Sequence, residues 1–168
     1  MATASPPRAS PTPASTSAAP AETPVYTYHC VCTQLLFATT TPLSSLPRRG
    51  ASNPDTTPLD RAYILPLPTR PPEEDDEDRH YALLLHVQPD RDRKPRIVQR
   101  EDGLEKRYPQ RCARCRCAVG YHLDWSHWGS EGEGKSGARG DVAYLLEGAV
   151  VGTEEMKRGE GGDTGAGR

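Results

Sequence analysis

The chain has 168 residues and a formal net charge of −2, so it has no overall electrostatic attraction to nucleic acid or to an anionic membrane. Only 35% of its residues are hydrophobic, and it carries 17 prolines and 15 glycines but a single phenylalanine. This composition predicts one small domain whose apolar core is marginal, a situation in which folds often depend on a metal or on disulfides.

Residues 1–24 are rich in proline, alanine, serine and threonine. Such a segment cannot bury enough apolar surface to offset its ordering entropy, so we expect a disordered tail. It lacks the apolar stretch of a secretory signal. No window of the chain approaches the roughly 18 apolar residues of a membrane-spanning helix. We therefore expect a reducing cytoplasm or nucleus, where clustered cysteines bind zinc more often than they form disulfides.

Short extended runs separated by turns occupy residues 25–151, and the first lies at residues 25–28. Only Leu59 to Leu65 favours a helical turn. The other strand-like windows are residues 35–38, 81–87, 97–98, 119–123 and 142–151, the last interrupted by Gly148. The expected fold class is mostly β: a small zinc-stabilised β domain over 25–151, built on two zinc-knuckle hairpins.

Two inner segments are predicted to be insertions in this domain. Residues 69–78 end in a run of acidic residues, 73–78, which repels itself and stays solvated. Residues 129–140 are rich in glycine, glutamate and serine. The glycine-rich segment 152–168 is expected to form a second disordered tail.

The five cysteines fall into two clusters, Cys30 with Cys32, and Cys112 with Cys115 and Cys117. Two short thiol pairs far apart in a chain are typical of a structural four-thiolate zinc site, because each tight turn presents two sulfurs to one ion. We predict that Cys30, Cys32, Cys112 and Cys115 bind one structural zinc ion.

The residue types also admit other assignments. The thiols could be merely buried, or they could form a redox dithiol, although no helix begins after Cys112 to lower a thiol pKa. Cys117, His29 and His122 are alternative ligands, but a closed structural site needs only four. In an extended strand, Cys117 lies about 6.5 Å beyond Cys115, so we expect it outside the ligand set.

A basic stretch, Lys106 to Arg111, continues to Arg114 and Arg116 around the second cysteine cluster. Its cations could bind phosphate on RNA or on a lipid head group, or they could offset the negative charge of nearby thiolates. The sequence contains no nucleophile with its base, no phosphate-binding glycine loop and no paired-carboxylate site. It therefore favours a protein that is not an enzyme.

Four blocks of the sequence resemble the STING ER exit protein family and identify the chain as a divergent, fungal-like member. They are residues 26–34 (YTYHCVCTQ), residues 46–49 with 59–62, residues 102–115 (DGLEKRYPQRCARC) and residues 144–151 (YLLEGAVV). Three features depart from the family pattern. Thr33 and Arg116 stand where the family has glycine after each knuckle, and Cys117 is additional. A glycine-rich tail replaces the family's lysine-rich helical extension.

The resemblance implies an intracellular adaptor in ER-to-Golgi transport, cytoplasmic or nuclear and possibly at the endoplasmic reticulum surface. Animal members of the family help a membrane client leave that organelle, in connection with phosphatidylinositol 3-phosphate production and membrane bending. The expected partners are therefore a membrane client, or trafficking and lipid-kinase proteins, with peripheral membrane contact possible. The alternative is a nuclear RNA- or ribonucleoprotein-associated module that stacks bases on Tyr108, Tyr121, Trp125 or Trp128.

Overall fold

The computed structural model describes residues 23–50, 60–73, 80–100 and 103–159. The two disordered tails and the solvated acidic run that the sequence predicts lie largely outside these residues.

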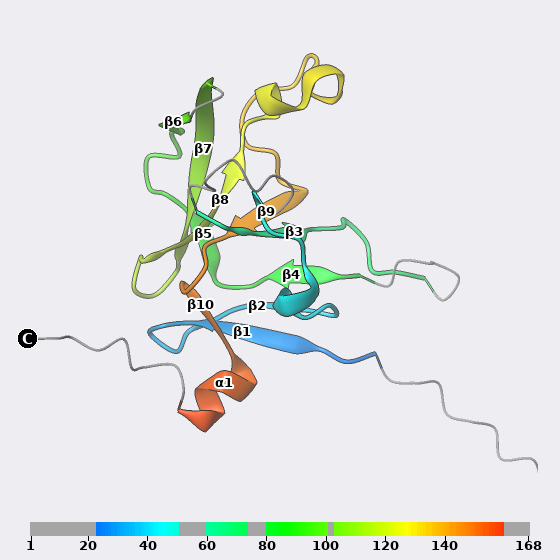
Figure 1. Ribbon diagram of the computed structural model, residues 1–168, viewed down its shortest axis with the longest axis vertical. Helices are drawn as coiled ribbons and strands as arrows, with labels where there is room; N and C mark the ends of the chain where they lie inside the picture. Colours follow the sequence, from blue (N-terminus) through cyan, green and yellow to red (C-terminus); the bar gives the residue numbers. More distant parts are fainter. Residues whose placement is uncertain (1–22, 51–59, 74–79, 101–102, 160–168) are drawn as a thin grey trace, which may run out of the picture.

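The described residues form a mostly β fold, as predicted. The strands are arranged in two antiparallel sheets (Figure 1). One sheet has the strand order β10-β1-β2-β4 and the other the order β3-β9-β8-β7-β5, with β6 also paired to β7. The first sheet comprises β1 (Tyr26–Cys30), β2 (Leu35–Thr39), β4 (Ala82–Leu84) and β10 (Val150–Gly152). The second comprises β3 (Tyr63–Pro66), β5 (Val87–Pro89), β6 (Arg96–Arg100), β7 (Gly103–Cys112), β8 (Ala118–Leu123) and β9 (Val142–Leu145).

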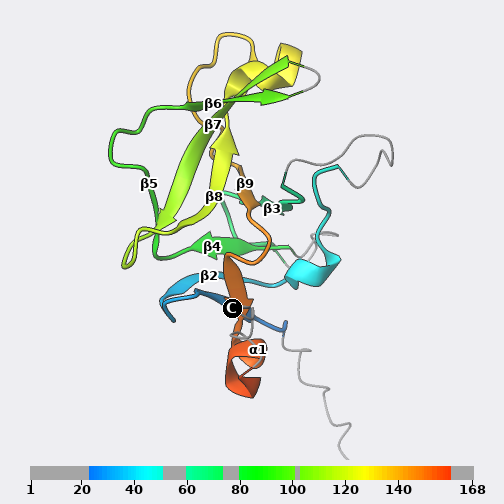
Figure 2. The same ribbon diagram turned by 60° about the vertical axis from the view of Figure 1, so that its left-hand side comes forward.

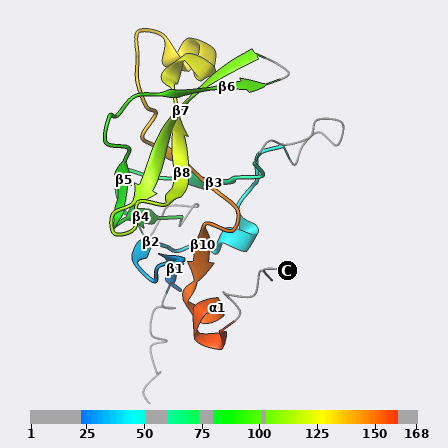
Figure 3. The ribbon, with the colours of Figure 1, turned by 90° about the vertical axis from the view of Figure 1, so that its left-hand side faces the viewer.

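Among the described strands, the chain passes between the two sheets four times: from β2 to β3, from β3 to β4, from β4 to β5 and from β9 to β10. Leu85 and His86 connect β4 of one sheet to β5 of the other, and the turn at Gly148 connects β9 to β10. Gly148 has a φ of 75°, a conformation that glycine adopts without steric cost. Figures 2 and 3 show the result: β7 and β8 rise away from β1 and β2, and the sheets approach each other where β7 ends.

Apolar side chains fill the space between the sheets. Leu36 and Phe37 of β2 meet Leu65, Val119 and Leu145 of the second sheet, and all five are almost completely buried. Cys30 and Cys112 belong to the same core, with exposures of 1% and 0%. The cysteine-bearing ends of β1 and β7 are therefore part of the packed interior.

The structure corrects three expectations for local structure. Residues 63–66, predicted as part of a helical turn, form β3, because they pair with β9. The predicted strand over 81–87 is divided by Leu85 and His86, where the chain changes sheets. The strand expected to lead into the second cysteine pair is longer than the basic stretch 106–111: residues 103–112 form β7, the longest described strand, since β5, β6 and β8 all pair with it.

Regular structure continues past the predicted boundary at residue 151: Gly152 is paired in β10, and Thr153–Arg158 form a short helix, α1. The Glu155 carboxylate accepts a hydrogen bond from the Gly152 N–H, which stabilises the first turn. Gly159 ends the helix in a left-handed conformation. A glycine-rich composition alone does not show these local contacts.

Two short 3-10 segments complete the described structure. The first, η1, spans Leu43–Ser45, and the second, η2, spans Trp125–Gly132 and is kinked at Trp128 and Gly129. The Asp124 carboxylate accepts the Ser126 N–H at the start of η2. The predicted insertion 129–140 therefore begins inside a defined turn of the chain.

Candidate metal centre

Each cysteine cluster lies in the turn of a β-hairpin, one from each sheet. The β1–β2 turn is closed by a hydrogen bond of 2.8 Å from the Thr33 N–H to the Cys30 carbonyl. The β7–β8 turn is closed by one of 3.0 Å from the Arg116 N–H to the Cys112 carbonyl. Thr33 and Arg116 both have positive φ angles, 69° and 64°. At these two positions the family that the sequence resembles has glycine. A positive φ explains this, because glycine adopts it without steric cost.

The four predicted cysteines lie together at the junction of the two sheets. The Sγ atoms of Cys30 and Cys115 are 3.4 Å apart, and those of Cys32 and Cys112 are 3.7 Å apart. All four sulfurs lie within 4.8 Å of one another. These distances exceed the roughly 2.05 Å of a disulfide bond, and all four thiols are free.

The two thiols of the first hairpin have opposite environments. Burial raises the pKa of the Cys30 thiol to about 12, although the Cys32 backbone N–H acts in the other direction. The Gln34 backbone N–H lowers the pKa of the Cys32 thiol to about 7. N–H groups directed at sulfur are the usual means of supporting thiolate ligands. The buried thiol, by contrast, needs a cation beside it to ionise at neutral pH.

The arrangement fits a bound metal ion. Metal–sulfur bonds of about 2.3 Å in a tetrahedron place sulfur atoms roughly 3.8 Å apart, close to the two distances between the hairpins. Two of the four cysteines are buried in the apolar core and two are half-buried, so the site lies at the edge of the core. The cluster can therefore hold one metal ion and, by doing so, join the two sheets.

The alternative ligands lie elsewhere. Cys117 is exposed, and it contributes its carbonyl to the turn by accepting the Cys112 N–H at 3.0 Å. The His29 ring faces the Thr153 hydroxyl across the β1–β10 pair at 3.4 Å. His122 is buried, its Nδ1 lies 2.7 Å from the Val142 carbonyl, and burial lowers its pKa. None of the three belongs to the group of four sulfurs.

The predicted basic stretch does not form one continuous cationic face. Arg107 turns inward to Glu105 and Asp60, whereas Arg111 pairs with Asp90 on β5's side. Arg114 donates to the Cys32 carbonyl, and this bond links the two cysteine hairpins. Distant acidic residues neutralise much of what is a run of cations in the sequence.

A buried charge network near β7 was not anticipated from the sequence. The Glu105 carboxylate accepts hydrogen bonds from Arg49 and Arg107 and is also paired with Arg100. Although burial opposes its ionisation, these guanidinium groups lower the pKa of Glu105 to about 2. The local signal in the sequence was that Lys106 and Arg107 follow Glu105 directly, whereas Arg49 lies 56 residues away in the chain.

The network continues to a buried aromatic pair. Asp60 accepts hydrogen bonds from Arg107 at 2.6 Å and from the Tyr121 hydroxyl at 2.8 Å. The guanidinium of Arg107 lies 4.2 Å from the centroid of the Tyr121 ring, and Tyr144 stacks on that ring. Together with the hydrogen bonds of Arg49 to Glu105 and Tyr121, these contacts attach Arg49 and Asp60 to the second sheet.

Most of the aromatic side chains proposed for base stacking already contact other side chains of the protein. Tyr121 is 4% exposed and stacked on Tyr144. The ring of Trp125 is covered by Lys135 and Arg139, and Arg139 also packs on Trp128. Tyr108 is half-buried, with its hydroxyl donating to Asp124.

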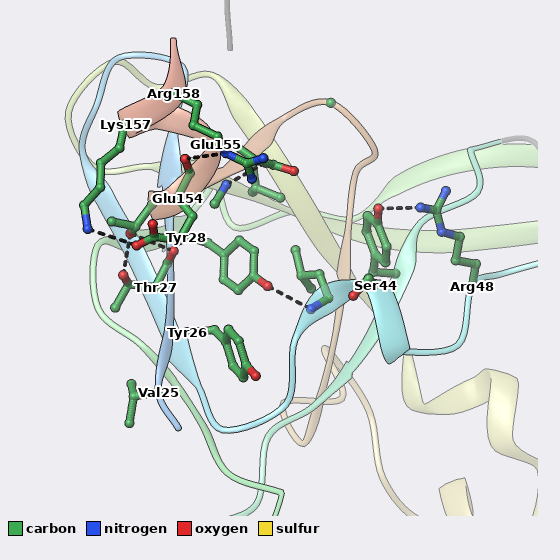
Figure 4. A pocket seen from close by; sticks show the side chains of 16 residues that line it. Val25, Tyr26, Thr27, Tyr28, Ser44, Arg48, Glu154, Glu155, Lys157 and Arg158 are labelled. Atoms are coloured by element: carbon green, nitrogen blue, oxygen red, sulfur yellow. Dashed lines mark hydrogen bonds and ion pairs between the residues drawn. The ribbon is translucent and has the colours of Figure 1, made fainter. Parts of the chain in front are cut away.

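A large hollow of about 690 Å³ lies at the other end of β1, between that strand, η1 and α1 (Figure 4). Tyr28 crosses it, and its hydroxyl accepts a hydrogen bond from the Leu43 N–H at 2.8 Å. Arg48 is paired with Glu147, and Lys157 with Glu154. These pairs leave the hollow without a strong net charge, and it has no connection to the cysteine cluster.

The fold and the cluster define a class: a small β domain in which two hairpins from different sheets bring four cysteines to one metal-binding position. Comparison with known families is more specific. The family model of the STEEP1 domain matches residues 19–160, and the chain belongs to this family. A comparison with curated proteins found no match. In the described part of the chain, no helix is long and apolar enough to cross a membrane.

Proposed function

We propose that the protein is a non-enzymatic adaptor whose β domain is held together by one structural zinc ion, bound by Cys30, Cys32, Cys112 and Cys115. The observation that carries the proposal is the meeting of four sulfurs from two different sheets within 4.8 Å. Zinc is the favoured metal because it prefers thiolate ligands in tetrahedral geometry. A site with four protein ligands leaves no open position for a substrate, which supports a structural role rather than a catalytic one.

Membership of the STEEP1 domain family supports a role in the exit of a membrane client from the endoplasmic reticulum. In this role the protein acts in the cytoplasm or nucleus, or at the surface of that organelle, through contacts with other proteins. The metal does not take part in transport. It fixes the relative position of the two sheets, and so the shape of the surface that partners contact.

The proposal is tested in cells that lack the protein. Transport of secretory-pathway membrane proteins out of the endoplasmic reticulum is followed after re-expression of the wild type, of Cys112→Ser or of Cys117→Ala. We expect exit to be restored by the wild type and by Cys117→Ala, and not by Cys112→Ser at equal protein level. Normal exit in cells without the protein would contradict the proposed role.

A further inference from the structure

Beside the second cysteine hairpin, three arginines surround a single hollow of about 390 Å³. Arg91 and Arg93 belong to the loop between β5 and β6, and Arg116 to the β7–β8 turn. Gln88, Pro89 and Asp90 form the rest of its wall. In the part of the chain that the structure describes, Arg91 and Arg93 are exposed and form no ion pair. A net charge of −2 for the chain makes this concentration of cations a local feature.

The hollow is held open by its own contacts. Arg116 donates to the Gln88 side chain and to the Pro89 carbonyl, each at 3.3 Å, which uses two of its N–H donors and leaves the others. The loop is closed by a hydrogen bond from the Arg93 N–H to the Asp90 carbonyl at 3.0 Å. An anion would therefore meet Arg116 already held in place, beside a loop backbone that carries Arg91 and Arg93.

The one carboxylate in the wall does not oppose an anion. Asp90 is paired with Arg111 at 3.0 Å and with Arg96 at 3.4 Å. The hydrogen bond from Arg111 lowers the pKa of Asp90 to about 2, so Asp90 is ionised at neutral pH. Arg111 and Arg96 offset this negative charge. The charges of Arg91, Arg93 and Arg116 remain available to a ligand.

A second, apolar hollow of about 250 Å³ shares a wall with the first. Pro89, Asp90 and Arg93 line both. The apolar part is formed by Tyr108 and Pro109 of β7 together with Ala138. Its size suits one apolar side chain. In an extended peptide, neighbouring residues are about 3.3 Å apart, so one strand can occupy both hollows within a few residues.

We propose that these two hollows bind a peptide with a phosphorylated serine or threonine, whose phosphate lies among Arg91, Arg93 and Arg116, and with an apolar residue one to three positions away that enters the second hollow. The inference rests on the proposed adaptor function, since it names the partner class. Arginine clusters bind phosphate through paired N–H donors. All three arginines line one hollow, which suits a single dianion better than the spaced phosphates of RNA. Among the described residues that line the two hollows, only Tyr108 offers an aromatic ring for base stacking.

The test uses the full chain and an immobilised peptide library with a fixed phosphoserine and degenerate flanking positions, next to the same library with serine. Peptides that bind are then measured by fluorescence anisotropy. We expect phosphorylation to tighten binding at least tenfold, and the Arg91→Ala/Arg93→Ala variant to lose that gain. Arg70→Ala, an exposed arginine of the segment after β3, is the matched control and should bind like the wild type.

A second variant probes the apolar hollow independently. Ala138→Leu fills it and should abolish the preference for an apolar residue near the phosphoserine, while dependence on phosphate persists. Equal binding to both libraries, or an Arg91→Ala/Arg93→Ala variant that binds normally, would overturn the proposal. So would tighter binding of a 12-nucleotide oligouridylate through the same arginines, which would assign the surface to RNA.

The cargo-exit assay separates this inference from the proposed function. If phosphopeptides do not bind but the wild-type protein restores exit, the inference alone fails. If they bind through the two arginines but the protein has no effect on exit, the proposed transport role fails while the binding site stands.

Discussion

The Sγ atom of Cys30 lies 3.4 Å from that of Cys115, although 85 residues separate them in the chain. The other cross-hairpin pair, Cys32 and Cys112, is 3.7 Å apart. Each sulfur is thus near a sulfur of the opposite hairpin and the opposite sheet. A metal ion at this position closes a long loop of the chain, which is where a cross-link stabilises a fold most.

The purified protein should contain one zinc ion per chain, and Cys115→Ala should lose it because one of four ligands is removed. Cys117→Ala is the matched control, since this exposed thiol lies outside the cluster and contributes only its carbonyl to the turn. Metal analysis and native mass spectrometry measure the stoichiometry. If Cys117→Ala loses zinc and Cys115→Ala keeps it, the ligand assignment is wrong.

Removal of the metal should unfold the β domain. The core is small, and a zinc–thiolate site can contribute on the order of 10 kcal/mol to folding. Circular dichroism before and after chelation should show loss of the β signal, and added zinc should restore it. An unchanged spectrum and melting temperature would mean that apolar packing suffices without metal.

Glu105→Gln should destabilise the protein by about 3 kcal/mol, because three arginines lose the buried carboxylate that pairs with them. Urea unfolding measures the difference from the wild type. The substitution Glu133→Gln, at an exposed glutamate, should change stability little.

The effect of Glu105 should also depend on pH. Its pKa is lowered from 4.5 to about 2 in the folded protein, so the unfolded chain takes up the proton first as pH falls. The advantage of the wild type over Glu105→Gln should be complete above pH 4.5 and disappear toward pH 2. Because acid also releases metal from thiolates, the comparison is made between the two proteins at equal metal content. A difference that does not change with pH would contradict this account.

Thr33→Gly should stabilise the first hairpin by up to about 1 kcal/mol. Thr33 has a φ of 69°, and the left-handed region is strained for a β-branched residue, while glycine adds some entropy to the unfolded chain. Thermal unfolding measures the change. Val31→Gly, in the same turn but without a positive φ, should instead destabilise. Equal effects of the two substitutions would show that conformational strain at Thr33 is negligible.

The local features of this protein can be predicted from residue type and spacing alone. The two cysteine clusters, the runs that became β1, β2, β6 and β8, and the break at Gly148 follow from residue type and spacing over a few positions. The four-cysteine site was predictable for the same reason, since each knuckle is a local turn and metal chemistry supplies the rule that joins two of them.

Tertiary structure decided what depends on distant partners. β7 is a strand because β5, β6 and β8 pair with it and because Asp60 and Arg49 compensate its charges, contacts that span up to 56 residues. Leu85 and His86 divide a strand-like window because two sheets need a crossing there. α1 follows directly on β10, whose Gly152 pairs with Tyr28 of β1. Such interactions stabilise a segment only once the rest of the chain has folded, so no local pattern reveals them.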